Sequence, residues 1–193
     1  MVLDALPSSF TTAQAEQCGL ERWRLYALRD AGEVVALSRG VWRRVDAPPI
    51  AHESLRAVSL RAPRGTICLL SALVFHDLTE EFATEVHLAV PRGLPRPCID
   101  YPPDEVHVFD ADTFELGREH IEVAPGEPVT IYDPVRSVVD AVRLRNQIGT
   151  DIAFGAARRL LQDRRAAAGD LLTTGQQLRC AGPVRELLEV LQA

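Results

Sequence analysis

The first 45 residues change their hydrophobic periodicity once. Apolar side chains recur every three or four positions as far as residue 31, a pattern typical of helices. They then give way to β-branched and aromatic residues, which are typical of a hairpin. Thr11 followed by Gln14 predicts a capping box, so we expect a helix to begin at Thr12. Gly19 and Gly32 are expected to end the two helices, because glycine accepts the left-handed conformation of a helix C-terminus.

The hairpin residues predict two strands, 34–37 and 41–45, joined by Ser38-Arg39-Gly40. Helix, tight turn, helix and hairpin in this order are the parts of a winged helix-turn-helix, so double-stranded DNA is the expected ligand. Residues 20–45 hold six arginines against three acids, a local +3 in a chain of net charge −6. The predicted DNA-contacting side chains are Thr12, Arg22, Trp23, Tyr26, Arg29, Arg39 and Arg43. The alternative is a structural helical hairpin whose arginines face only water.

Several short sequence blocks lie along these predicted elements. They are Phe10-Thr11-Thr12-Ala13-Gln14-Ala15, Gly19-Leu20, Leu25, Leu28, Ala31-Gly32-Glu33, and Leu37-Ser38-Arg39-Gly40-Val41-Trp42. Together they resemble the N-terminal domain of AbiEi-type antitoxins, the transcriptional-repressor half of type IV toxin-antitoxin modules. The resemblance implies a repressor of its own operon that counters a nucleotidyltransferase-like toxin, and it leaves open whether the two proteins touch. Relatives usually carry a full helix ahead of this motif, whereas only residues 1–6 precede Pro7 here.

A proline-containing segment, 46–50, marks an expected linker between a DNA-binding domain (1–49) and a second domain (50–193). The second domain holds fifteen arginines and twenty-one acids, so its net charge is negative and we do not expect it to bind DNA. Its patterning predicts an α+β fold, a small sheet with C-terminal helices. We expect strands at 85–90, 106–109, 120–123 and 129–132, and helices at 51–60, 67–75, 134–144, 151–168, 170–180 and 183–191. Asp133 is the expected cap of the helix that begins at Pro134.

The basic residues restrict the chemistry, because all 21 are arginine and none is lysine. A P-loop, a Schiff base and the lysine usual in nucleases are thereby excluded, so we predict a protein that is not an enzyme and has no catalytic residues. Ser71, beside His76-Asp77, lacks the motif of a nucleophile elbow. The remaining alternative enzyme is a restriction-endonuclease-like protein that uses Asp112 and Glu122.

Histidine and cysteine spacing does not favour a metal site or another cofactor. His87, His107 and His120 fall on three predicted strands and converge only if those strands pair; the alternative is a polar, solvated sheet face. The four cysteines are expected to be small buried residues.

Arginines 158, 159, 164 and 165 predict a basic stripe along one helix. The stripe is a candidate partner-binding surface, with a solvated, ion-paired face as the alternative. No segment has the length of a membrane span and no signal pattern is present, so we expect a cytoplasmic protein without a membrane partner. If no toxin partner exists, a stand-alone winged-helix regulator is the alternative function.

Overall fold

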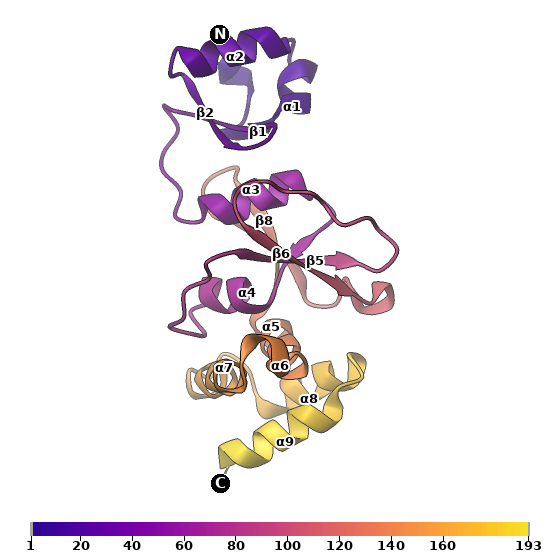
Figure 1. Ribbon diagram of the computed structural model, residues 1–193. Coiled ribbons are helices and arrows are strands. Elements are labelled where there is room, and N and C mark those ends of the chain that lie inside the picture. Colours follow the sequence, from indigo (N-terminus) through magenta and orange to yellow (C-terminus); the bar gives the residue numbers. More distant parts are fainter. Residues whose placement is uncertain (1, 193) are drawn as a thin grey trace.

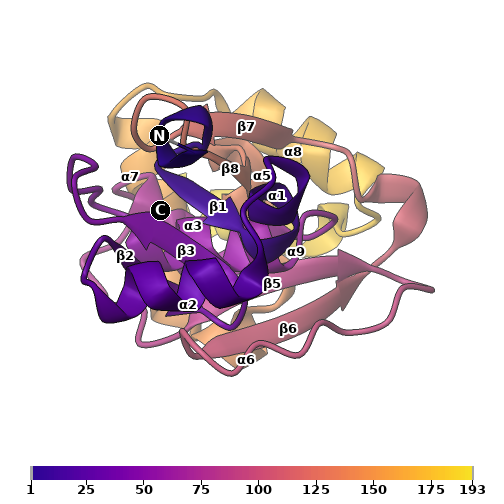
Figure 2. The same cartoon turned by 90° about the horizontal axis from the view of Figure 1, so that it is seen from above.

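A computed structural model describes residues 2–192 as a mixed α+β chain with two small sheets (Figure 1). The elements are stacked in layers along one axis, with the N-terminus at the top of Figure 1 and the C-terminal helices at the bottom. Figure 2 looks down this axis and shows α2 and the first sheet in front of the larger one. The first residues and the last helices therefore lie at opposite ends of the molecule.

The N-terminal unit, residues 2–45, consists of η1 (Val2–Ala5), β1 (Ser9–Thr11), α1 (Thr12–Gln17), α2 (Arg22–Asp30), β2 (Val34–Ser38) and β3 (Val41–Arg44). The predicted helices and hairpin are confirmed as elements. Its three strands are antiparallel in the order β1-β3-β2. The core of the unit includes Phe10, Leu25 and Trp42.

The predicted helix boundaries rest on two local devices, and both are present. Thr11 Oγ1 accepts the Gln14 backbone N–H at 3.2 Å, while Gln14 Oε1 accepts the Thr11 N–H at 2.8 Å. This reciprocal capping box begins α1 at Thr12. Gly19 and Gly32 follow the two helices with φ of +82° and +74°, the conformation that glycine adopts without strain.

The larger sheet belongs to the second part of the chain, which begins with α3 (Glu53–Arg61), β4 (Thr66–Ile67), α4 (Leu69–Phe75), β5 (Val86–Pro91), β6 (Asp104–Phe109), η2 (Ala111–Thr113), β7 (Arg118–Glu122) and β8 (Pro128–Tyr132). Its order is β6-β5-β4-β8-β7, with β5 parallel to β6 and β4 parallel to β8. The expected helix 67–75 is wrong at its start, because Thr66–Ile67 forms the short central strand and the helix begins at Leu69.

Five helices complete the described chain: α5 (Pro134–Arg143), α6 (Arg145–Ile148), α7 (Thr150–Gln162), α8 (Ala168–Gln177) and α9 (Ala181–Gln192). Asp133 caps α5 as predicted, since its carboxylate accepts the Arg136 N–H at 2.7 Å. The expected helix 151–168 is too long: α7 ends at Gln162, and Arg164 just beyond it has φ of +55°. The short helix α6 was not expected.

Helix α5 is the centre of the second part, because it lies between the larger sheet and the helices α7, α8 and α9. Arg136 and Asp140, one turn apart, are both buried and joined by a 2.7 Å ion pair, and Arg143 contacts the other Asp140 oxygen at 2.7 Å. Gly117 lies against the start of this helix. A Cβ there would come within 2.6 Å of Asp133 Oδ2, so the close approach requires glycine.

The first sheet packs on α3, which in turn packs on the larger sheet. Leu37 and Val41 of the hairpin form a small core with Ala57 of α3. Beside this core Glu127, 1% exposed, pairs with two arginines: Arg43 of β3 at 3.0 Å and Arg56 of α3 at 2.6 Å. We call these three residues the seam, since they join the N-terminal unit to the second part of the chain.

Two further expectations concern the surface and the cysteines. Within residues 2–192, no helix is both long and apolar enough to cross a membrane. All four cysteines are free thiols, and Cys68 and Cys180 are buried as expected. Cys18 and Cys98 are exposed, which corrects the prediction for those two, because one ends the short helix α1 and the other lies in the loop between β5 and β6.

Candidate nucleic-acid interface

Helix α2 lies at the N-terminal end of the molecule (Figure 1). It presents a row of polar and aromatic side chains. Arg22, Tyr26 and Arg29 are all exposed, while Leu25 is the helix residue that is fully buried against the sheet. The Arg29 guanidinium lies 5.1 Å from the centre of the Tyr26 ring, and this ring packs edge-on against Trp42 at 5.6 Å. The row is therefore held in place from beneath by the hairpin.

The hairpin tip is fixed to the start of α1. The Trp42 indole N–H donates to Thr12 Oγ1 at 2.9 Å, and the Thr12 backbone N–H donates to the Gly40 carbonyl at 2.9 Å. Arg39, next to Gly40, is exposed. Thr12 thus connects α1 with the hairpin, whose tip carries Arg39.

Arg43 corrects the set of predicted DNA contacts. It lies on β3 as expected, but its side chain is 6% exposed and binds Glu127 and Ser9 Oγ, the latter at 2.8 Å. It also donates to the Pro48 carbonyl. The side chain turns inward because β3 is the central strand of a sheet whose other face packs on α3, so Arg43 belongs to the seam and not to an outer surface.

The charge of the outer face is more balanced than the residue count implies. Arg22 pairs with Glu16 at 3.2 Å and Arg29 with Asp30 at 2.7 Å, and all four side chains are at least 46% exposed. Arg44 pairs with Asp46 at 2.7 Å. With Arg43 buried as well, the local +3 overstates the positive charge that a ligand would meet.

Trp23 lies on a different side of α2. It is 67% exposed and, with Leu3, Leu20 and Ala27, lines an open groove of about 540 Å³. Ala27 and Ala31, which also line this groove, are exposed.

The expected basic stripe on a single helix is wrong. Arg158 and Arg159 lie on α7, but Arg164 and Arg165 follow its end. Arg159 pairs with Glu80 at 2.7 Å, and Arg165 donates to the His76 carbonyl at 2.6 Å. Two of the four arginines therefore fasten the segment after α4 to the end of α7.

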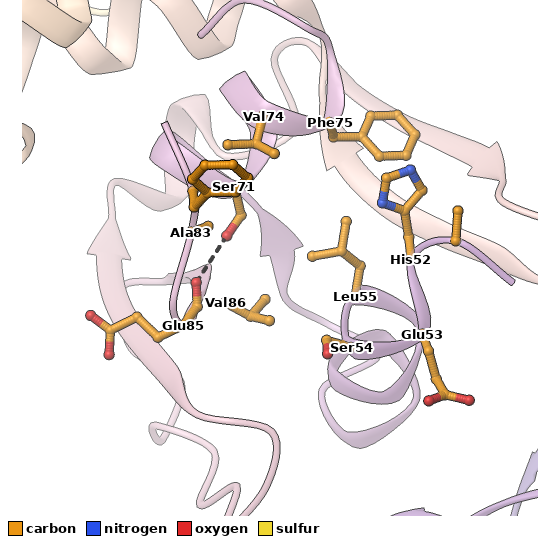
Figure 3. Close-up of a pocket in the computed structure, with 12 residues that line it drawn as sticks. His52, Glu53, Ser54, Leu55, Ser71, Val74, Phe75, Ala83, Glu85 and Val86 are labelled. Carbon is orange, nitrogen blue, oxygen red and sulfur yellow. Dashed lines mark hydrogen bonds between the residues drawn. The ribbon is translucent and has the colours of Figure 1, made fainter. Parts of the chain in front are cut away.

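A pocket of about 300 Å³ lies between α3 and α4. Figure 3 shows the residues that line it. The His52 and Phe75 rings pack against each other at one side of it, with their centres 4.8 Å apart. Ser71 points toward the start of β5, where its hydroxyl donates to the Glu85 carbonyl at 3.3 Å and accepts the His87 N–H at 2.9 Å. Its hydroxyl thus holds β5 to α4, while the His76 ring nitrogen contacts the Tyr132 carbonyl at 2.8 Å. Ser71 and His76 do not form a nucleophile pair.

Two of the three predicted histidines meet. His87 of β5 and His107 of β6 are 7% and 9% exposed, and their ring nitrogens lie 3.0 Å apart. Glu105, the register partner of His87, joins them at 3.5 Å. His120 lies on β7, at the opposite edge of the sheet, and contacts Thr130 at 3.0 Å. The expected solvated face is wrong for His87 and His107, which are buried.

Burial lowers the pKa of both His87 and His107 below the ordinary histidine value, although Glu105 acts in the opposite direction. The pKa of His107 is lowered further by His87 and Arg96. Both rings are therefore neutral near pH 7, the form in which imidazole nitrogen binds metals. Of the described residues, only these two histidines and Glu105 form a group with the spacing of metal ligands.

Sequence reasoning missed Glu105, Trp42 and Glu127. Glu105 and His107 do carry a signal, because residues two apart on a strand share a face. The contact between Glu127 and Arg43, 84 positions apart, has no comparable local signal. No protein-family model matches the chain, and no significant match to a curated protein was found either.

Proposed function

We propose that this chain is a sequence-specific DNA-binding transcriptional repressor whose N-terminal unit is a winged helix-turn-helix. In this proposal α2 is the recognition helix and the β2–β3 hairpin is the wing. The observation that carries it is the exposed row of Arg22, Tyr26 and Arg29 on α2, which packs through Tyr26 on Trp42 of the hairpin. A helix supported by a sheet and exposed along one row has the shape that enters a major groove.

The acids near this row do not oppose the proposal. Glu16 and Asp30 pair with Arg22 and Arg29 in exposed positions, and such surface ion pairs contribute only about 0–1 kcal/mol. A DNA phosphate offers each guanidinium a charge-assisted, bidentate partner in their place. The exchange therefore costs little compared with a phosphate or guanine contact.

We further propose that the protein is the antitoxin of a type IV toxin-antitoxin pair, with a nucleotidyltransferase-like toxin as its counterpart. The support for this part is the resemblance in residues 10–42. The natural test is growth of cells that express the full chain together with a nucleotidyltransferase encoded next to it. Rescue of growth supports the antitoxin role. Failure to rescue, or a neighbouring frame that is not toxic, leaves a stand-alone regulator.

DNA binding is tested with the purified full chain and two labelled duplexes of equal length and composition. One covers the region upstream of the protein's own gene, and the other is a scrambled version. Fluorescence anisotropy over a salt series is expected to show tighter binding to the upstream duplex, with affinity that falls as salt rises. Equal affinity for both duplexes contradicts sequence specificity, and no binding to either contradicts the proposal as a whole.

The matched variants are two double substitutions of exposed arginines. Arg22→Ala with Arg29→Ala removes the charges of the α2 row, whereas Arg158→Ala with Arg164→Ala removes two charges from the distant C-terminal part. We expect the first pair alone to abolish the preference for the upstream duplex. Similar losses in both pairs would indicate a general charge effect.

A further inference from the structure

The edge of the larger sheet carries two imidazoles and a carboxylate from adjacent strands. His87 faces Glu105 across the parallel β5–β6 pair, and His107 follows Glu105 by two positions on β6. All three side chains therefore project from the same face of the sheet. Their ligand atoms lie within 4.8 Å of one another.

The distances match those between ligands of one metal ion. Nitrogens at about 2.0–2.1 Å from a shared ion stand about 2.8–3.4 Å apart when the angle between them is 90–110°. The observed separation between His87 Nδ1 and His107 Nε2 is 3.0 Å, and Glu105 Oε2 lies 3.5 Å from His87 Nδ1. The two ring planes are nearly parallel, at 6° to each other. One of the two nitrogens donates its proton to the other, and a bound ion would displace this proton and lie to one side of the line that joins the nitrogens.

We propose that His87, Glu105 and His107 bind one divalent transition-metal ion, with Zn²⁺ as the representative. Two imidazoles with one carboxylate suit Zn²⁺ and its neighbours, whereas Mg²⁺ and Ca²⁺ favour oxygen-only ligand sets. Glu105 is 47% exposed, and with His107 it lines an open cavity of about 530 Å³. The ion therefore has three protein ligands and a side open to the cavity, where water completes the coordination.

Several charged residues surround the three proposed metal ligands. Arg96 and Arg143 line the same cavity, and Glu85 lies close enough to His87 to raise the pKa of this histidine against the effect of burial. Arg143 pairs with Asp140 at 2.7 Å, and the same carboxylate also pairs with Arg136. The ligand set holds one negative charge, Glu105, so the bound ion keeps a net positive charge that a small anion entering the cavity could meet.

The test uses untagged full-length protein, treated with a chelator and kept reduced, in equilibrium dialysis against micromolar free Zn²⁺. We expect one bound equivalent. His107→Gln is expected to lower the affinity about 100-fold or more, and Glu105→Gln at least about 10-fold, by loss of a ligand. His120→Gln is the matched control, because it changes a histidine of the same sheet that lies at the far edge. Its affinity is expected to equal that of the wild type.

Two further measurements keep the outcome unambiguous if His107→Gln fails to fold. Glu105 is half exposed, so Glu105→Gln keeps the fold, and its unfolding temperature should lose the Zn²⁺-induced rise that the wild type shows. Co²⁺ bound in place of Zn²⁺ should give visible absorption bands without a thiolate charge-transfer band, since no cysteine belongs to the set. Absence of bound Zn²⁺, equal binding by Glu105→Gln, or a thiolate band would each overturn the proposal.

Discussion

The arginines on the two faces of the N-terminal unit have different surroundings. On its outer face Arg22 and Arg29 are exposed and pair with exposed acids. On its inner face Arg43 is buried and shares Glu127 with Arg56. The outer arginines can exchange their partners for a ligand at small cost. If the inner arginines moved away from Glu127, this buried carboxylate would lose its counter-charges.

The difference comes from the packing around each guanidinium and not from the residue type. The five N–H donors of arginine allow several acceptors at once, which suits a buried position. Arg136 illustrates this inside the second part of the chain: it bonds Asp140 and two backbone carbonyls, and its guanidinium lies 4.4 Å from the centre of the Tyr132 ring. In a chain without lysine, arginine thus provides both the internal ion pairs and the candidate ligand-binding charges.

Removal of a buried carboxylate is expected to have the largest effect. Asp140→Ala leaves Arg136 and Arg143 facing each other without a counter-charge, and we expect a loss of about 3–5 kcal/mol in the free energy of unfolding. Urea unfolding followed by circular dichroism measures this loss. Asp112→Ala, which changes an exposed aspartate in η2, is the control and should alter stability by less than about 0.5 kcal/mol. A similarly small loss in Asp140→Ala would show that the ion pair does not stabilise the helix layer.

A substitution in the seam should lower the free energy of unfolding by a smaller amount. Glu127→Gln removes the shared charge, but Arg43 keeps Ser9 and the Pro48 carbonyl as partners. We expect a loss of about 3 kcal/mol, near the lower end for buried pairs. The loss should appear locally, as faster proteolysis of the segment 46–52 and faster amide exchange in β3. Glu122→Gln on the exposed strand β7 is the control. Unchanged exchange in β3 would mean that Glu127 does not hold the two parts together.

The sequence predicted local features well. Capping residues and glycines act on neighbouring backbone groups, so the ends of α1 and α2 and the cap of α5 follow from residues within four positions. Most strands of the larger sheet were also predicted, because their alternation is local. The two-residue strand β4 was not, since its pairing partners on β5 and β8 are far away in sequence and its residues merge with the apolar helix α4.

The candidate sites show the same division. Exposure of Arg22, Tyr26 and Arg29 follows from helical periodicity. The burial of Arg43 depends on α3 and Glu127, which no local pattern connects with β3. The meeting of His87 with His107, and not with His120, depends on the strand order β6-β5-β4-β8-β7. Periodicity gives the face on which a side chain lies, while the neighbouring strand decides what it meets.

A substitution on the outer face should leave stability unchanged and alter DNA binding. Arg22→Ala is expected to cost about 1–3 kcal/mol of specific binding, because a guanidinium in the major groove reads base edges. The free energy of unfolding should change by less than about 0.5 kcal/mol, as the side chain is 65% exposed. Anisotropy titrations with the upstream and scrambled duplexes measure the first quantity, and urea unfolding the second. A loss of stability with unchanged binding would assign Arg22 to the structure of the unit.

The smallest change is expected at the hairpin tip. Arg39 is exposed beside Gly40 and belongs to the loop between β2 and β3, so in the proposed complex it meets phosphates or a minor groove. Arg39→Ala should weaken binding to the upstream and scrambled duplexes by the same factor, because a backbone contact carries little sequence information. It should also reduce the slope of log affinity against log salt by about one, the change expected when one phosphate contact is lost. Arg39→Lys keeps the charge and should retain the slope. A slope that is equal in wild type and Arg39→Ala, or a loss confined to the upstream duplex, would move Arg39 from the wing contact to another role and leave the α2 row as the candidate interface.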